Sequence, residues 1–205
     1  MAINFGPDWQ RDLWASPYRL RFELNEGGSY VNMFTRAYDR ARCLARAALP
    51  SERVIAVIAA SPNPSEEVGA ARRGWLGRAA YEVLGEMGVP TTPSEAIWLG
   101  YTYPPEAEGA EVRPCEHRAV FVTWDQADIL LWSQIARDIG ITPQAPVLSR
   151  LVDVERGVTV YAYDDRGMDI TATCPDPIAE LYNRFDAWLL DYDRSRMSEA
   201  FAGKG

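Results

Sequence analysis

The chain has few of the residues, histidine and cysteine above all, from which catalytic and metal centres are usually built. Its 205 residues include one histidine, His117, and three cysteines, Cys43, Cys115 and Cys174, with no Cys-x-x-Cys pair. An odd number of widely spaced cysteines is neither a disulfide framework nor a zinc site. A His-centred triad would have to use His117, which lies beside Cys115 and has only Glu116 as a neighbouring acid. Because nucleophile–base pairs usually come from distant segments, this local arrangement does not indicate catalysis.

Long apolar runs and a basic charge balance are missing as well. The longest purely apolar run, Val54 to Ala60, is far too short to span a membrane. The first ten residues have no basic stretch followed by an apolar one, so we expect no secretory signal and a cytoplasmic protein. The net charge of −8 argues against nucleic-acid binding, which needs a basic surface. A protein partner with a basic surface fits better, although acidity also serves solubility alone.

Standard catalytic motifs are also absent from the sequence. The glycine-rich pieces at residues 26–29 and 69–77 match neither of the phosphate-binding fingerprints. No serine lies in a Gly-x-Ser-x-Gly elbow. We therefore predict no catalytic residue and no cofactor.

The chain does carry clear strand and helix patterns. Residues 18–24 alternate between polar and apolar side chains, which predicts a strand with one buried face. Residues 30–48 change to a helical period, and residues 53–60 form the continuous apolar run of a central strand. Further expected elements are a helix from Asn63-Pro64 to Gly88, strands at 96–103 and 118–124, and a helix capped by Asp125 that runs to about Asp138.

The last third predicts a three-stranded meander followed by a helix. The strands cover residues 146–154, 158–163 and 168–173, and Asp176-Pro177 opens a helix that reaches about Tyr192. This element order suggests a single domain of the α/β class, or alternatively α+β, in which helices pack against one mixed sheet. We expect the domain to span residues 1–197 and residues 198–205 to form a flexible tail.

Charged residues gather in the expected hairpin between the last two strands. Turn chemistry uses one aspartate, Asp164 or Asp165, to start the turn, and Gly167 with a positive φ to close it. It requires neither Arg166 nor Asp169. An arginine between carboxylates is typical of an ion-pair network, and such networks fix structure more often than they perform chemistry.

A second charged group lies at the expected end of the last helix. Asp191 and Asp193 would oppose the helix dipole there unless a cation pairs with them. Arg194 and Arg196 are close in sequence, and Arg166 would reach them if the hairpin packed on the helix. We interpret the two groups first as a clasp between hairpin and helix. The alternative is an acidic pocket for a divalent metal or a basic partner group. The candidate binding residues are Asp164, Asp165, Arg166, Asp169, Asp191 and Asp193, and no metal ligand is assigned.

The first strand raises a related question. Arg19, Arg21 and Glu23 share one face of it, opposite its apolar residues. If another element covers that face, these charges must be paired, because an isolated buried charge is costly. If the face is open to water, they are ordinary surface residues.

Three pieces of the chain carry a resemblance to a known family. They are Leu20-Arg21-Phe22-Glu23-Leu24, the stretch Tyr163-Asp164-Asp165-Arg166-Gly167-Met168-Asp169, and Trp188-Leu189-Leu190-Asp191-Tyr192-Asp193-Arg194. In this order they resemble the bacterial domain-of-unknown-function family DUF3885. The resemblance covers about residues 18–194 and implies a small bacterial cytoplasmic protein. It brings no established activity and therefore no catalytic residues.

These observations favour a non-enzymatic acidic domain that binds a protein. Seven Trp and ten Tyr residues supply the usual interface anchors, and acidic residues steer association with a basic partner. An immunity protein that neutralises a bacterial toxin by occlusion is one protein of this kind. The alternative is an enzyme with a carboxylate-rich, divalent-metal-dependent site. A third interpretation is a structural module in which the acid–arginine network only joins the hairpin to the last helix.

Overall fold

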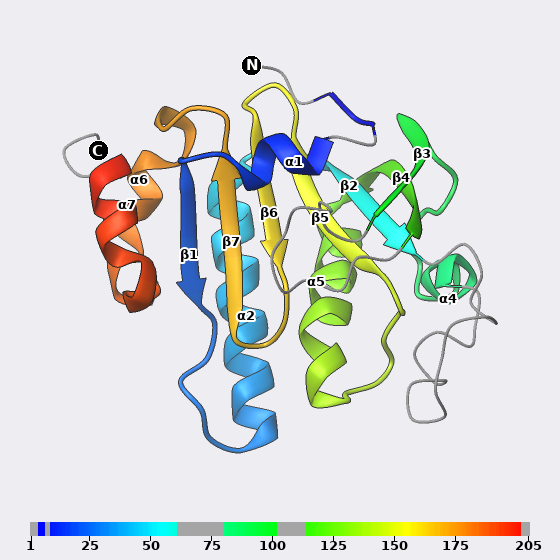
Figure 1. Ribbon diagram of the computed structural model, residues 1–205. Helices are drawn as coiled ribbons and strands as arrows, with labels where there is room; N and C mark the ends of the chain where they lie inside the picture. The colour runs from blue at the N-terminus through cyan, green and yellow to red at the C-terminus, as the bar shows by residue number, and fades with distance from the viewer. Residues whose placement is uncertain (1–3, 7–8, 61–79, 102–113, 202–205) are drawn as a thin grey trace.

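The fold is built on one seven-stranded sheet. The computed structural model describes residues 4–6, 9–60, 80–101 and 114–201, and Figure 1 shows their arrangement. The strand order is β1-β7-β6-β5-β2-β4-β3, and all six pairings are antiparallel, where the sequence suggested a mixed sheet. The strands are β1 Arg19–Glu23, β2 Arg53–Ala60, β3 Ala96–Tyr101, β4 Pro114–Thr123, β5 Leu148–Asp153, β6 Val158–Ala162 and β7 Gly167–Ala172.

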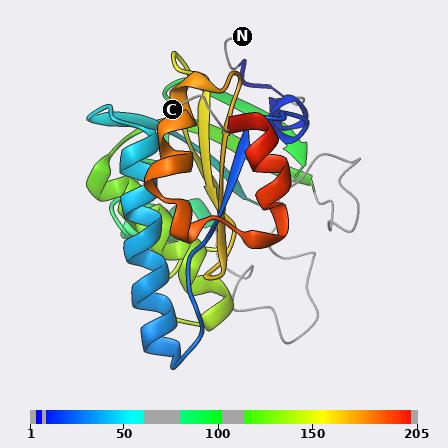
Figure 2. The ribbon, with the colours of Figure 1, turned by 90° about the vertical axis from the view of Figure 1, so that its left-hand side faces the viewer.

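Helices cover both faces of the sheet and one of its edges. Helices α2 and α5 lie side by side on one face, and the short α1 crosses the other face (Figure 1). Figure 2 shows α6 and α7 in front of the edge formed by β1. The helices described are α1 Trp9–Trp14, α2 Tyr30–Ala48, α4 Ala80–Glu86, α5 Trp124–Ile139, α6 Ala179–Arg184 and α7 Arg194–Phe201. This single domain of helices packed on a sheet, with a C-terminal meander and helix, confirms the expected fold class.

The main core lies between the sheet and helices α2 and α5. The alternation of β1 directs Leu20 and Phe22 into this core, where both are fully buried. A smaller apolar cluster lies under α1 on the opposite face, and it includes Trp9 and Leu13. The largest side chains buried completely are Phe22, Phe201, Leu20, Leu24, Leu44, Leu49, Ile58, Leu84, Leu130, Ile135, Leu151 and Met168.

Two elements match their sequence patterns residue for residue. Helix α2 has the expected bounds, and Ser29 caps it by accepting a hydrogen bond from the backbone N–H of Asn32. Strand β2 is buried along nearly its whole length, as a continuous apolar run predicts for a central strand.

Helix α5 begins one residue before Asp125, so the prediction that Asp125 caps this helix was wrong. Thr123 is the cap instead, in a capping box with Gln126.

Part of the predicted organisation falls outside the described residues. Of the helix expected from Asn63 to Gly88, the structure describes α4, and the proposed Asn63-Pro64 start lies beyond the described ranges. The Pro/Glu-rich connection at residues 104–113 also lies outside them. Strand β4 begins at Pro114, earlier than the pattern at residue 118 indicated.

The expected last helix is broken into several pieces. After the 3-10 turn η1 (Asp176–Ile178), α6 ends at Arg184, and two further 3-10 turns follow, η2 (Asp186–Trp188) and η3 (Asp191–Asp193). Between these turns the backbone of Leu189 and Leu190 is extended. Leu189 pairs with Phe22, and the N–H of Leu190 donates to the carbonyl of Arg21 at 2.8 Å. The edge of β1 therefore captures the chain where a continuous helix was predicted.

The end of the described chain also differs from the prediction. Helix α7 continues through Phe201, whose side chain is fully buried against the rings of Tyr18 and Tyr182. Residues 198–201 therefore belong to the folded domain, and the expected flexible tail does not begin at residue 198. Within the described ranges, no helix has the length and apolar content needed to cross a membrane.

Candidate functional site

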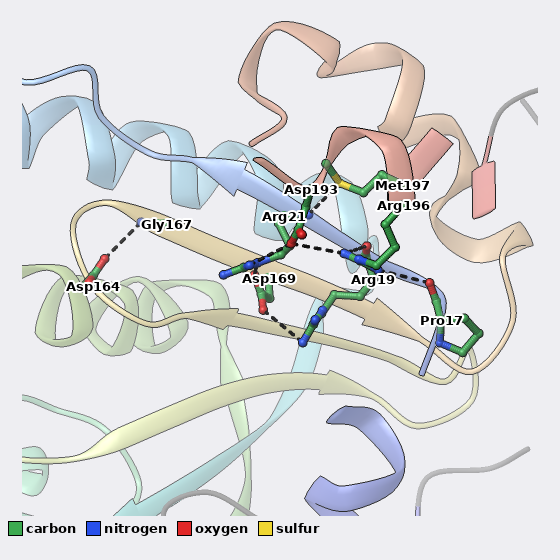
Figure 3. Close-up of polar contacts among 9 residues, drawn as sticks. All are labelled: Pro17, Arg19, Arg21, Asp164, Gly167, Asp169, Asp193, Arg196 and Met197. Atoms are coloured by element: carbon green, nitrogen blue, oxygen red, sulfur yellow. Dashed lines mark hydrogen bonds and ion pairs between the residues drawn. The ribbon is translucent and has the colours of Figure 1, made fainter. Parts of the chain in front are cut away.

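The first strand supplies two arginines to the face of the sheet away from α2. Because side chains alternate along a strand, Arg19 and Arg21 point opposite to the core residues of β1. Asp169 lies directly across from Arg21 on β7. The Nε atom of Arg21 donates to Asp169 Oδ1 at 3.1 Å, and Arg19 Nη1 lies 3.9 Å from Asp169 Oδ2 (Figure 3). The two arginines on this face are thus paired, as the covered-face alternative required, whereas Glu23 at the end of the strand is exposed.

The C-terminal turn η3 brings a second aspartate to the same arginine. Arg21 Nη1 donates to Asp193 Oδ2 at 2.8 Å, and Arg196 Nη2 lies 3.6 Å from the same oxygen (Figure 3). Arg196 also donates to the carbonyl of Arg19 at 3.1 Å. We name Arg19, Arg21, Asp169, Asp193 and Arg196 the arginine cluster. Its three guanidinium groups and two carboxylates give it a positive formal charge within an acidic chain.

Burial and pairing shift the pKa values in this cluster in different directions. Burial raises the pKa of Asp169, while the charges of Arg21 and Arg19 oppose that rise. Desolvation acts the same way on Asp193, but its hydrogen bond and charge interaction with Arg21 prevail and lower its pKa. The pKa of Arg21 is raised because its two carboxylate partners outweigh desolvation. The cluster therefore holds Arg21 and Asp193 in their charged forms.

The side chain of Tyr163 borders the cluster. Burial, followed by the negative charge of Asp169, raises the pKa of its phenol. Tyr163 lies over Gly167, where an added Cβ atom would collide with the phenol oxygen and ring. Gly167 does not have a positive φ, so that part of the turn prediction was wrong. The glycine is needed because the ring of Tyr163 occupies the space of a side chain.

Asp164 organises the hairpin turn, as turn chemistry predicted. Its Oδ1 accepts hydrogen bonds from the backbone N–H groups of Arg166 at 2.8 Å and Gly167 at 3.2 Å. The guanidinium of Arg166 pairs with the same carboxylate, although the Arg166 side chain is 76% exposed. Arg166 therefore serves its own turn and is not the residue that joins the hairpin to the last helix. That clasp is made by Arg21 instead.

Asp165 ties the tip of the hairpin to the segment after β1. The side-chain amide of Asn25 donates to the backbone carbonyl of Asp165 at 2.7 Å and to its Oδ2 at 2.8 Å. The N–H of Leu24 donates to the carbonyl of Arg166 at 2.8 Å. Asp164 and Asp165 are both buried in the turn that precedes β7. Arg21, which binds Asp193, lies further along, across from Asp169 within the strand, and Figure 3 shows Asp164 apart from this pairing.

Asp191 stands apart from both groups. Its side chain is 92% exposed and accepts a hydrogen bond from Arg194 Nε at 3.0 Å. Asp191 and Asp193 precede the first turn of α7 and do not follow the end of a helix. The expected conflict with the helix dipole was therefore wrong, because acids at a helix N-terminus are favourable.

Comparison with known proteins identifies one family that covers most of this arrangement. A family model described as a domain of unknown function (DUF3885) matches residues 3–193. The chain belongs to the DUF3885 family. The matched range of this DUF3885 protein contains β1, β7 and η3, the three segments that meet at Arg21. No curated protein and no solved structure matches the chain.

The five aspartates singled out in the DUF3885 sequence do not form one pocket. Asp164 and Asp165 belong to the hairpin tip, Asp169 and Asp193 to the arginine cluster, and Asp191 to the surface. Among the described residues, no three His, Cys, Asp or Glu side chains are grouped as metal ligands would be.

The sequence interpretation named Arg196 as a candidate partner of Asp191 and Asp193, and the structure places it beside Asp193. It gave no role to the side chain of Tyr163, and it did not connect Arg19 and Arg21 with the aspartates. The signal that could have found the cluster was the arginine pair on the polar face of β1. Those residues must find carboxylates once the face is covered.

Proposed function

We propose that this DUF3885 protein is a non-enzymatic acidic domain that binds a protein with a basic surface. The observation that carries the proposal is the turn η3, where the ring of Tyr192 stands 89% exposed between two aspartates. Tyrosine is among the residues that most often dominate binding energy, and the exposed carboxylate of Asp191 beside it attracts a basic partner.

The contacts around Tyr192 hold its backbone in one position. On one side, Asp193 is bound to Arg21, and Leu190 donates to the edge of β1. On the other side, Arg194 donates to Asp191 at 3.0 Å and to Asp186 at 2.6 Å. A turn fixed in this way loses little conformational freedom on binding, so more of the contact energy becomes affinity.

The distribution of charge supports a basic protein partner. The chain contains a single lysine, Lys204, and its other 20 cationic residues are arginines. Many described arginines are held in ion pairs with carboxylates of the same chain: Arg19, Arg21, Arg36, Arg40, Arg42, Arg46, Arg118, Arg137, Arg166, Arg194 and Arg196. With these arginines paired inside the chain, the net charge of −8 attracts a basic protein and repels nucleic acid.

More specifically, the protein is an immunity protein in the bacterial cytoplasm. It occludes the basic surface of a toxin. The enzymatic alternative has less support, because the aspartates that would build its site are separated and mostly paired with arginines. A purely structural role explains the arginine cluster, but it does not explain why Tyr192 is exposed to solvent.

A capture experiment with two matched variants tests the proposal. The tagged protein, its Tyr192→Ala variant and its Tyr30→Ala variant are incubated with lysate of the native host at low, moderate and high salt. Tyr30 is a suitable control because it is another tyrosine with 74% of its surface exposed. We expect one basic protein to be retained by the wild type and Tyr30→Ala, to be lost with Tyr192→Ala, and to dissociate at high salt. Absence of any partner at low and moderate salt, or equal capture by Tyr192→Ala, would contradict the proposal.

A further inference from the structure

A nearly buried arginine lies near the centre of the sheet face crossed by α1. Arg150 belongs to β5, and only 7% of its surface is exposed. Its neighbour on β2 is Val57, and its guanidinium carbon lies 4.2 Å from the ring centre of Tyr161 on β6. The indole of Trp9, from α1, is 5.9 Å away. The surroundings of this cation are thus aromatic and apolar.

Arg150 has no anionic partner among the described residues. The structure shows no hydrogen bond and no ion pair from its guanidinium to any part of the chain it describes. Asp169 lies across from Tyr161, one strand further away, and is engaged by Arg21 and Arg19. An arginine cannot lose its proton in a protein, and cation–π contacts offset only part of the cost of burying its charge.

Other polar atoms on the same face are also buried without a partner. The indole N–H of Trp9 and the hydroxyl of Thr159, two residues before Tyr161 on β6, make no hydrogen bond. His117 lies on this face as well, in contact with Trp98, with its Nδ1 unpaired. Burial and the nearby charge of Arg150 lower the pKa of His117 to about 4, which keeps the ring neutral. Buried polar groups are satisfied in most proteins, so several unpaired ones around one cation require an explanation.

We propose that Arg150 is the anchor of a binding site for a small ligand that carries an oxyanion, either a carboxylate or a phosphate. The planar guanidinium matches two oxygens of such a group. The rings of Trp9 and Tyr161 lie beside it, and the indole N–H of Trp9 and the hydroxyl of Thr159 on the same face have no hydrogen-bond partner of their own. This site is separate from the turn at Tyr192 and does not depend on the proposed function.

Thermal unfolding with defined anions tests the site. The wild-type protein is heated with sodium phosphate, phenyl phosphate or sodium benzoate, each compared with sodium chloride at equal ionic strength. A ligand that binds only the folded state raises the unfolding temperature. We expect at least one probe to raise it, with the two phosphates and the benzoate distinguishing the two kinds of oxyanion. We also expect Arg150→Met to weaken binding of that probe by at least about thirty-fold.

The stability of Arg150→Met without any probe provides the second criterion. If Arg150 is paired only when a ligand is bound, replacing it with an apolar side chain of similar length leaves the unfolding temperature of the free protein unchanged or raises it. The matched control is Arg184→Met, because Arg184 lies over the ring of Phe185 but is exposed. We expect the unfolding temperature of Arg184→Met to rise with the probe as that of the wild type does.

Three results would overturn the proposal. The first is the absence of any shift with all three probes, and the second is equal loss of the response in both variants. The third is a lower unfolding temperature for Arg150→Met without probe, which would mean that the chain itself supplies the partner of Arg150.

Discussion

Arg21 and Asp193 are 172 positions apart in the chain, and their side chains form a hydrogen bond of 2.8 Å. Arg21 also binds Asp169 on the adjacent strand, so a single guanidinium joins the first strand, the last hairpin and the C-terminal turn. The turn that exposes Tyr192 is held in place by this contact.

Loss of the Arg21 guanidinium should destabilise the fold. We expect Arg21→Met to lower the free energy of unfolding by about 2–3 kcal/mol, because two largely buried carboxylates lose the arginine that donates hydrogen bonds to them. This value is below the range for a fully buried pair, since 26% of the Arg21 side chain is exposed. Arg166→Met, which removes a 76% exposed arginine, should cost less than about 1 kcal/mol. Urea unfolding measures both variants, and a larger loss for Arg166→Met would contradict the assignment of the clasp.

The two aspartates of η3 should behave differently when their charge is removed. Asp193→Asn loses a charged hydrogen bond to Arg21 and should cost about 1–2 kcal/mol of stability, whereas Asp191→Asn should change it little. The pKa of Asp193 is lowered in the folded protein, so its contribution is present above the unfolded pKa and is lost as the pH falls. Unfolding of both variants at pH 7 and pH 3 tests this. The difference between Asp193→Asn and wild type should shrink in acid.

Gly167 should tolerate no side chain. A Cβ atom there would meet the ring of Tyr163, so Gly167→Ala should lower the free energy of unfolding by about 2 kcal/mol or more. Gly85→Ala is the matched control, because Gly85 lies in helix α4 with open space around it. We expect that control to be neutral or to stabilise the protein by up to about 1 kcal/mol. Equal effects of the two substitutions in thermal or urea unfolding would refute the steric argument.

The single histidine should make stability depend on pH. Burial, together with the charge of Arg150, lowers the pKa of His117 from 6.5 to about 4. The unfolded protein takes up a proton on this ring at a higher pH than the folded protein does. The free energy of unfolding is therefore highest above pH 6.5 and decreases as the pH falls toward 4. We expect this decrease in the free energy of unfolding to reach about 3 kcal/mol and to be absent from the His117→Gln variant. Nuclear magnetic resonance can follow the one imidazole directly, and a midpoint near 6.5 would show that the ring is not desolvated.

The sequence predicted the elements whose stability is local. Helix α2 and strand β2 were predicted with their observed bounds because one helical face and one apolar run determine them. The break at Leu189 could not be predicted in this way. It depends on hydrogen bonds to β1, a segment more than 160 residues earlier.

The candidate site was predicted only in part, for the same reason. The role of Asp164 in the turn follows from residues next to it. The partners of Asp169 and Asp193 depend on the register between β1 and β7 and on the path of the C-terminal segment. The need for Gly167 arises from the position of Tyr163, which sequence patterns cannot distinguish from a requirement for positive φ.

The affinity of the captured partner for the wild type, Tyr192→Ala and Tyr30→Ala tests the central claim most directly. Calorimetric titration at two salt concentrations gives the three dissociation constants. A hot-spot tyrosine contributes about 2 kcal/mol or more, so we predict at least about thirty-fold weaker binding for Tyr192→Ala and near wild-type binding for Tyr30→Ala. We also predict weaker binding of the wild type at higher salt. Equal dissociation constants for the wild type and Tyr192→Ala would contradict the account.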